Sequence, residues 1–175
     1  MAKDAQNAVD AAVKMEQDSI DFYNKAAGTT RNRLGKSMFE SFVKDEKRHL
    51  DALQRVVAGV APSLKVEKIL ASRKNSFKAG VATVFENARR ELVDRVPSDA
   101  DDVKALGIAI ELERTGFKFY ADAAAKAGNE LQRKLYAALQ NEENEHLDFL
   151  QNTLDYLEDT GNWFLWEEHG LLDGG

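Results

Sequence analysis

The sequence repeats itself over a fixed distance of 97 residues, and this repeat is the strongest constraint on the fold. Glu46 and His49 form a Glu-x-x-His pattern, which returns at Glu143 and His146. The same gap-free offset relates further identities, among them the pairs Glu16/Glu113, Phe22/Phe119, Tyr23/Tyr120, Asn32/Asn129 and Leu53/Leu150. Shared helical composition alone would not align the rare residues His, Tyr and Phe in one register. We therefore interpret the chain as an internal duplication, longer than the usual solenoid repeat.

Apolar residues at helical spacing predict that each repeat is a helical hairpin. The expected helices span about 4–27, from the break at 28–32 to about 57, 99–127, and 129–158. The break at 28–32 lies midway between Glu16 and Glu46, and the break at 128–129 lies midway between Glu113 and Glu143. Residues equidistant from the turn of an antiparallel hairpin lie level with each other. Each hairpin should therefore hold its two glutamates at the same height.

The fold class expected is all-α: a four-helix bundle in one domain, residues 1–175, with hairpins at about 4–58 and about 99–158. Pro62 and Pro97 bracket a crossover at about 62–97 with eight Lys or Arg against four Asp or Glu, a net +4 in a chain of −6. We interpret it as a solvated helical connector along the bundle, with a docking surface as the alternative. A short helical tail at about 159–175 carries two tryptophans and is expected to cover the bundle or to contact another subunit.

The two Glu-x-x-His patterns predict a metal site, because helical i,i+3 spacing puts a carboxylate and an imidazole on one face. Glu16 and Glu113 interrupt apolar stripes and supply one carboxylate from each remaining helix, which completes the ligand set of di-iron carboxylate bundles. The predicted ligands are Glu16, Glu46, His49, Glu113, Glu143 and His146. Such mixed ligation suits Fe or Mn, and Zn could also bind. A purely structural cluster is disfavoured, because four buried carboxylates without cations would each carry a large desolvation penalty.

Residues next to the ligands also repeat. Asp45 precedes Glu46 and Glu142 precedes Glu143. A metal-bound histidine usually donates its second N–H to a carboxylate, so we expect Asp45 near His146 and Glu142 near His49. Two turns beyond the single glutamates stand Tyr23 and Tyr120, either as core aromatics or with a redox or hydrogen-bonding role. His169 has no partner in a packed stripe and is left out of the site.

Composition excludes several classes of protein. The chain has no cysteine, which excludes disulfides, thiolate metal sites and a Cys-ligated rubredoxin or iron–sulfur module within it. The first seven residues show no apolar signal core, and no apolar run reaches 18 residues, so we expect a cytoplasmic protein without a membrane span. The net charge of −6 argues against nucleic-acid binding.

The ordered set of four ligand elements resembles the di-iron domain of the rubrerythrin family, within the ferritin-like superfamily. The resemblance covers both hairpins and implies an up–down bundle with a long crossover, a centre of two Fe ions at the six predicted ligands, and redox chemistry with peroxide or dioxygen. Two features differ from the family pattern. Typical rubrerythrins carry a C-terminal rubredoxin domain, and a further glutamate where this chain has Gly116. The six-ligand set looks closer to that of bacterioferritin.

We therefore expect an oxidoreductase that reduces hydrogen peroxide or O₂ with electrons from a separate donor protein. A ferroxidase-type protein of iron binding or storage is the alternative, and a metal-binding assembly module without turnover is a third hypothesis. From Asp155 onward the chain has six acidic residues and no Lys or Arg, which could pair with the basic crossover of a second copy. A homodimer is therefore expected rather than a storage shell.

Overall fold

The computed structural model describes residues 2–57 and 100–160, which form four long helices. They are α1 (Ala2–Thr29), α2 (Arg33–Val57), α5 (Ala100–Lys126) and α6 (Glu130–Thr160). Their bounds agree with the predicted helices to within about three residues at each end. The predicted crossover lies outside the described residues, as does the C-terminal tail beyond Thr160.

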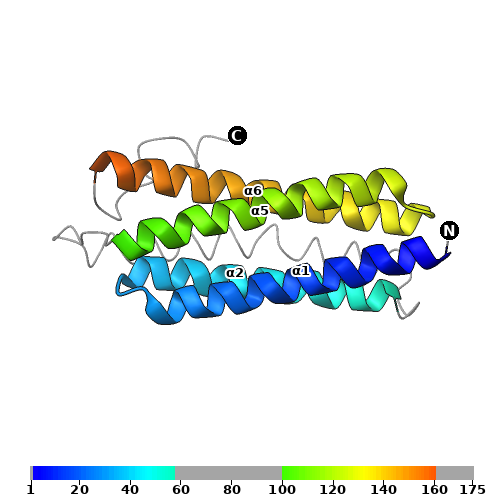
Figure 1. The fold of residues 1–175 in the computed structure, drawn as a ribbon, viewed down its shortest axis with the longest axis horizontal. Coiled ribbons are helices and arrows are strands. Elements are labelled where there is room, and N and C mark those ends of the chain that lie inside the picture. Colours follow the sequence, from blue (N-terminus) through cyan, green and yellow to red (C-terminus); the bar gives the residue numbers. More distant parts are fainter. Residues whose placement is uncertain (1, 58–99, 161–175) are drawn as a thin grey trace, which may run out of the picture.

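The helices form two antiparallel hairpins, α1 with α2 and α5 with α6, packed into one bundle (Figure 1). Most contacts between helices lie within a hairpin, and fewer join α1 to α5 or α2 to α6. The two hairpin turns lie at opposite ends of the bundle, so α1 runs antiparallel to α5 and α2 runs antiparallel to α6. The predicted all-α bundle of paired hairpins is confirmed. The sequence repeat thus becomes an approximate two-fold relation between the hairpins.

Equivalent asparagines begin the second helix of each hairpin. The Asn32 side-chain oxygen accepts hydrogen bonds from the backbone N–H groups of Leu34 at 2.8 Å and Gly35 at 3.1 Å. Asn129, 97 residues later, accepts one from the N–H of Gln132 at 2.9 Å. Asparagine is among the best N-cap residues because its oxygen satisfies a donor that the first helical turn leaves unpaired. Both hairpin turns therefore end with the same local chemistry.

Two hydrophobic clusters fill the bundle on either side of its middle. One joins the later part of α1 to the early part of α2, with the start of α5 and the end of α6: its largest fully buried side chains are Tyr23, Phe39, Phe42, Leu106 and Leu150. The other joins the opposite parts of the same helices, and its largest fully buried side chains are Leu53, Tyr120, Leu135 and Leu139. Burying each such side chain stabilises the fold by roughly 1.5–3 kcal/mol. The clusters leave a polar layer between them.

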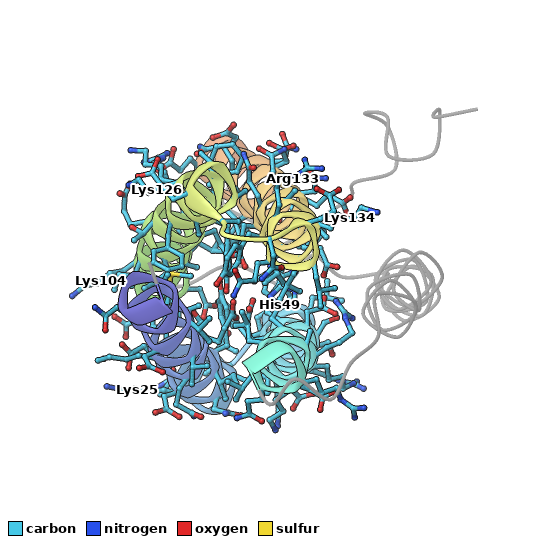
Figure 2. All side chains as sticks on the ribbon, turned by 90° about the vertical axis from the view of Figure 1, so that its right-hand side faces the viewer. Lys25, His49, Lys104, Lys126, Arg133 and Lys134 are labelled. Atoms are coloured by element: carbon cyan, nitrogen blue, oxygen red, sulfur yellow. The ribbon has the colours of Figure 1, made fainter. Side chains whose placement is uncertain are left out.

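Charged side chains such as Lys126, Arg133 and Lys134 point outward in the end-on view, whereas His49 lies between the four helices (Figure 2). Within the described ranges 2–57 and 100–160, no helix is long and apolar enough to cross a membrane. His49 belongs to the buried polar layer in which the predicted site residues lie.

Candidate metal centre

His49 lies at the centre of the first group of predicted ligands. Its Nδ1 atom is 3.0 Å from Glu46 Oε2 and 3.4 Å from both Glu16 Oε2 and Glu143 Oε1. Atoms bound to one cation at about 2.0–2.2 Å lie roughly 3 Å apart in a tetrahedral or octahedral shell. The spacing of these four atoms therefore suits a common cation. The histidine is fully buried, and each of the three carboxylates is nearly so.

His146 occupies the equivalent position in the second group. Its Nδ1 atom lies 3.3 Å from Glu46 Oε1 and 3.4 Å from Glu113 Oε2. The two groups with ligand atoms mutually within 4.8 Å are Glu16, Glu46, His49 and Glu143, and Glu46, Glu113, Glu143 and His146. Glu46 turns one oxygen to each histidine, and Glu143 also belongs to both groups. The structure thus brings all six predicted ligands together as two joined groups.

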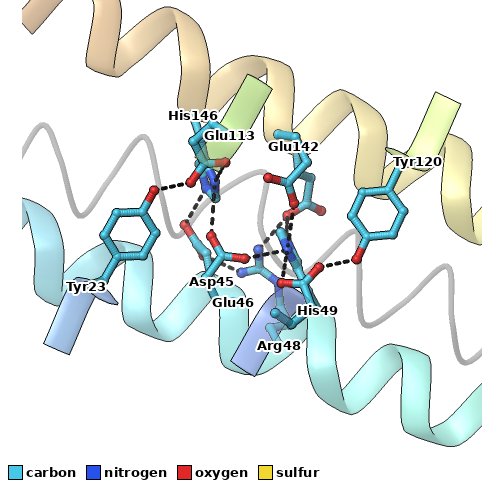
Figure 3. Close-up of polar contacts among 11 residues, drawn as sticks. Tyr23, Asp45, Glu46, Arg48, His49, Glu113, Tyr120, Glu142 and His146 are labelled. Atoms are coloured by element: carbon cyan, nitrogen blue, oxygen red, sulfur yellow. Dashed lines mark hydrogen bonds and ion pairs between the residues drawn. The ribbon is translucent and has the colours of Figure 1, made fainter. Parts of the chain in front are cut away.

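The outer nitrogens of the histidines meet carboxylates of the opposite hairpin. His49 Nε2 lies 2.8 Å from Glu142 Oε2, and His146 Nε2 lies 3.4 Å from Asp45 Oδ2 (Figure 3). These are the cross-helix pairs that the sequence predicts. The second pair lies four residues earlier on α2, at 45 instead of 49, and four residues later on α6, at 146 instead of 142, as antiparallel helices require. Each carboxylate therefore leaves Nδ1 of its histidine directed at the ligand group.

Arg48 joins the two outer carboxylates. Its Nη1 donates to Asp45 Oδ1 and its Nη2 donates to Glu142 Oε2, both at 2.7 Å. The arginine side chain is 16% exposed, so it lies at the edge of the site between α2 and α6. Sequence reasoning missed this residue. The signal was present, since Arg48 stands inside the first Glu-x-x-His pattern, but the equivalent residue in the second repeat is Glu145, and the repeat therefore did not single it out.

Two tyrosines close the ends of the polar layer. The Tyr23 hydroxyl donates to Glu113, and the Tyr120 hydroxyl donates to Glu16 (Figure 3). Moving seven residues forward along α1, from 16 to 23, corresponds to moving seven back along α5, from 120 to 113. Both tyrosines are fully buried in the hydrophobic clusters. They are therefore core aromatics with a hydrogen-bonding role, and each contacts the glutamate of the other hairpin.

Burial and mutual repulsion divide the charge among the carboxylates. Burial is the main cause that raises the pKa of Glu16 from 4.5 to about 8. Burial, followed by the charges of Glu113 and Glu46, raises the pKa of Glu143 well above its usual value. Burial also acts to raise the pKa of Glu46, but His49 and His146 outweigh it and hold that pKa well below 4.5. The pKa values of these three neighbouring carboxylates therefore move in opposite directions, because each buried negative charge disfavours ionisation of the next.

The same burial and the same buried charges also shift the pKa values of the histidines and tyrosines. Burial acts to lower the pKa of His49, but the charges of Glu46 and Glu16 raise it well above 6.5. Burial also acts to lower the pKa of His146, but the charge of Glu113 is the main cause that raises it well above 6.5. Burial and the adjacent glutamate charges raise the pKa of both tyrosines well above 10, so their hydroxyls stay protonated and act as donors.

Buried side-chain atoms of three predicted ligands accept or donate no hydrogen bond among the described residues, and these residues belong to the two ligand groups. The atoms are Nδ1 of His49, Oε1 of Glu46 and Oε2 of Glu113. Buried polar atoms without partners are rare and call for an explanation. Two cations, one per group, would satisfy these atoms and balance the four ligand carboxylates. The residues therefore fit the metal pair that their sequence pattern predicts, while the identity of the metal stays a prediction.

The fold and the site together define the class of four-helix bundles that carry a carboxylate- and histidine-lined two-metal centre. The sequence profile of the rubrerythrin family matches residues 7–154. Because this match spans most of the 175 residues, the chain belongs to the rubrerythrin family. A search of solved structures found none that matches the chain.

Proposed function

We propose that this chain is a non-haem di-iron oxidoreductase that reduces hydrogen peroxide or dioxygen with electrons from a separate donor protein. The observation that carries the proposal is the pair of buried Glu/His groups that share Glu46 and Glu143. Family membership supports it, since the matched region contains both groups. Iron bound there would supply reversible one-electron chemistry to an oxidant that reaches the site.

The protein's own residues would bind the two ions in a charged layer that is enclosed by apolar side chains. Glu46 and Glu143 would hold both ions, while Glu16 and Glu113 would each hold one. Tyr120 and Tyr23 fix the orientation of those two single carboxylates through their hydroxyl hydrogen bonds. The hydrophobic clusters on either side exclude water from the ends of the layer, which strengthens the electrostatic contacts inside it.

The first test is metal stoichiometry. An anaerobic titration with Fe²⁺ should saturate at two ions per chain, because the ligands form two equivalent groups. His49→Ala and His146→Ala should each weaken one ion more than the other. Glu40→Gln changes an exposed carboxylate on α2 and serves as the matched control. Saturation at one equivalent or none would overturn the metal assignment.

The second test is turnover. Stopped-flow mixing of the ferrous protein with peroxide and with O₂ should show which oxidant reacts faster, and an artificial electron donor should sustain repeated reduction of that oxidant. The reaction should be lost in His49→Ala, which removes the only nitrogen ligand of the first group, and retained in Glu40→Gln. Binding of two irons without sustained turnover of either oxidant would support the metal site but would reject the proposed oxidoreductase activity.

A ferroxidase-type role in iron binding or storage is the second candidate, and the glycine at position 116 favours it, because it leaves the six-ligand set that resembles that of bacterioferritin. A Cβ atom built on Gly116 would lie 3.0 Å from Glu143 Oε2, so Glu143 occupies the space next to this position. The further glutamate typical of rubrerythrins is absent there, which leaves six ligands. Uptake of tens of irons per chain would support storage, whereas iron content limited to two supports the enzyme.

We also propose that the active form is a homodimer. The proposal is supported by sequence alone: segment 62–97 carries a net +4, and the chain from Asp155 onward carries six acidic residues and no Lys or Arg. Opposite charges on two segments of one chain can pair between two copies, and a two-fold axis closes such an assembly. Sedimentation should show a dimer whose dissociation increases with salt. A particle of shell size would contradict the dimer and favour storage.

A further inference from the structure

Arg48 contacts the outer carboxylates of both histidines, and this arrangement has no counterpart in the second repeat. Asp45 lies on the same helix as Arg48, whereas Glu142 belongs to α6 of the other hairpin. The position equivalent to Arg48 is Glu145, which is exposed. One guanidinium therefore serves both halves of a site that is otherwise built by duplication.

The geometry of the guanidinium is suited to this task. Its two terminal nitrogens reach one carboxylate each at 2.7 Å, and its planar fork holds the two directions at a fixed angle. Glu142 Oε2 accepts from Arg48 and also lies 2.8 Å from His49 Nε2. Asp45 gives one oxygen to Arg48 and the other faces His146 Nε2 at 3.4 Å. A short chain of contacts thus runs from one histidine to the other through Arg48.

Charge gives a second reason for a cation at this place. Four ligand carboxylates balance two divalent ions, but Asp45 and Glu142 add two further acidic groups that are 3% and 6% exposed. Like charges so close to the ligand group would repel each other and draw the carboxylates apart. Arg48 neutralises part of this charge and joins two hairpins that share few other contacts across α2 and α6.

We propose that Arg48 is a positioning residue that holds Asp45 and Glu142 in place and thereby sets the metal affinity of both histidine positions. This inference rests on the proposed metal centre but not on the oxidoreductase activity. Outer partners of metal-bound histidines fix the ring orientation, and their loss typically lowers metal affinity by about 10- to 100-fold. Because one arginine orients both partners, its loss should weaken both positions.

The test separates the positions by using single-histidine backgrounds and Co²⁺ as a spectroscopic probe. His146→Ala retains the group around His49, and His49→Ala retains the group around His146. Adding Arg48→Gln to each background should lower Co²⁺ affinity by about 10-fold or more in both. Arg55→Gln is the matched control, since this exposed arginine on α2 pairs only with the exposed Asp51 among the contacts described.

Arg48→Lys provides the conservative variant. A lysine carries one ammonium group and cannot fork to two carboxylates, so affinity should recover in one background more than in the other. The Co²⁺ absorption spectrum should shift in Arg48→Gln, because reorientation of the imidazole changes the ligand field. A purely structural arginine would instead lower the melting temperature of the metal-free protein and leave both affinities and the spectrum unchanged.

Each outcome decides a separate statement. Wild-type protein that binds no Co²⁺ would reject the metal centre itself. Normal binding by the wild type with unchanged binding by Arg48→Gln, loss in only one background, or equal loss in Arg55→Gln would overturn the role of Arg48. If Arg48→Gln does not fold, Arg48→Lys carries the comparison. A change in Co²⁺ affinity by the same factor in both backgrounds would then overturn the role of Arg48.

Discussion

Gly116 offers a sharp test of the site geometry, because the same substitution should change stability and metal affinity in different ways. The residue lies on α5, and a Cβ atom added to it would meet Glu143 Oε2 at 3.0 Å and Glu143 Cδ at 3.2 Å. Glu143 would have to move by a few tenths of an ångström to admit Gly116→Ala. The effect depends on whether Glu143 is free to make that movement.

In the metal-free protein the movement is easy, since the atoms met first belong to the end of a flexible side chain. Replacing Gly by Ala inside a helix stabilises it by about 0.8–1 kcal/mol. Gly116→Ala should therefore leave the melting temperature of the metal-free form unchanged or slightly raised. In the metal-bound protein Glu143 would be held by both ions, and distances in such shells vary by only about ±0.2 Å.

The strain of overpacking, typically about 1–3 kcal/mol, should then appear as lost metal affinity, a factor of about 5 to 150. An anaerobic Co²⁺ or Fe²⁺ titration measures this loss, and thermal unfolding measures the stability of the metal-free form. The matched control is Gly107→Ala on the same helix, where an added Cβ has nothing within 4 Å. It should raise stability without changing affinity.

Unchanged metal affinity in Gly116→Ala would refute the reasoning, because it would mean that Glu143 does not hold the ions from the position described. Equal losses in Gly116→Ala and Gly107→Ala would refute it as well, since they would assign the effect to the helix and not to the contact.

Three further predictions follow from the buried charges. Removing the metals should lower the melting temperature, whereas replacing both Glu16 and Glu113 by Gln should abolish tight binding and stabilise the metal-free form; equal melting of all three samples would contradict this. The metal-free protein should lose stability as the pH rises, because the pKa of Glu16 is raised from 4.5 to about 8: its contribution is fully present below 4.5 and is lost as the pH rises through about 8. Unfolding temperatures measured between these values check the sign, and a steady rise would contradict it. Tyr120→Phe and Tyr23→Phe should each cost about 1 kcal/mol in denaturant unfolding, and by nearly equal amounts because the two contacts are equivalent; a large effect of only one would argue against the two-fold relation.

The amino-acid sequence was sufficient to predict the bundle and the six Glu and His side chains that the structure brings together, although not Arg48. The fixed offset identified equivalent residues, and helical periodicity placed Glu46 and His49 on one face of one helix. The turn positions then placed Glu16 level with Glu46 within the hairpin. Each of these steps uses only distances along one helix or across one short turn, which local geometry determines.

The tertiary structure decided those contacts between helices that the repeat and the helical periodicity did not predict. The hydrogen bonds from Tyr23 to Glu113 and from Arg48 to Glu142 join residues of different hairpins, and the tight approach of Glu143 to Gly116 depends on the packing of α6 against α5. Helical periodicity states which face a residue occupies but not which residue of another helix lies opposite. That register is set by how the hydrophobic clusters pack, and so the same packing that buries the core also decides the partners and pKa values of the metal centre.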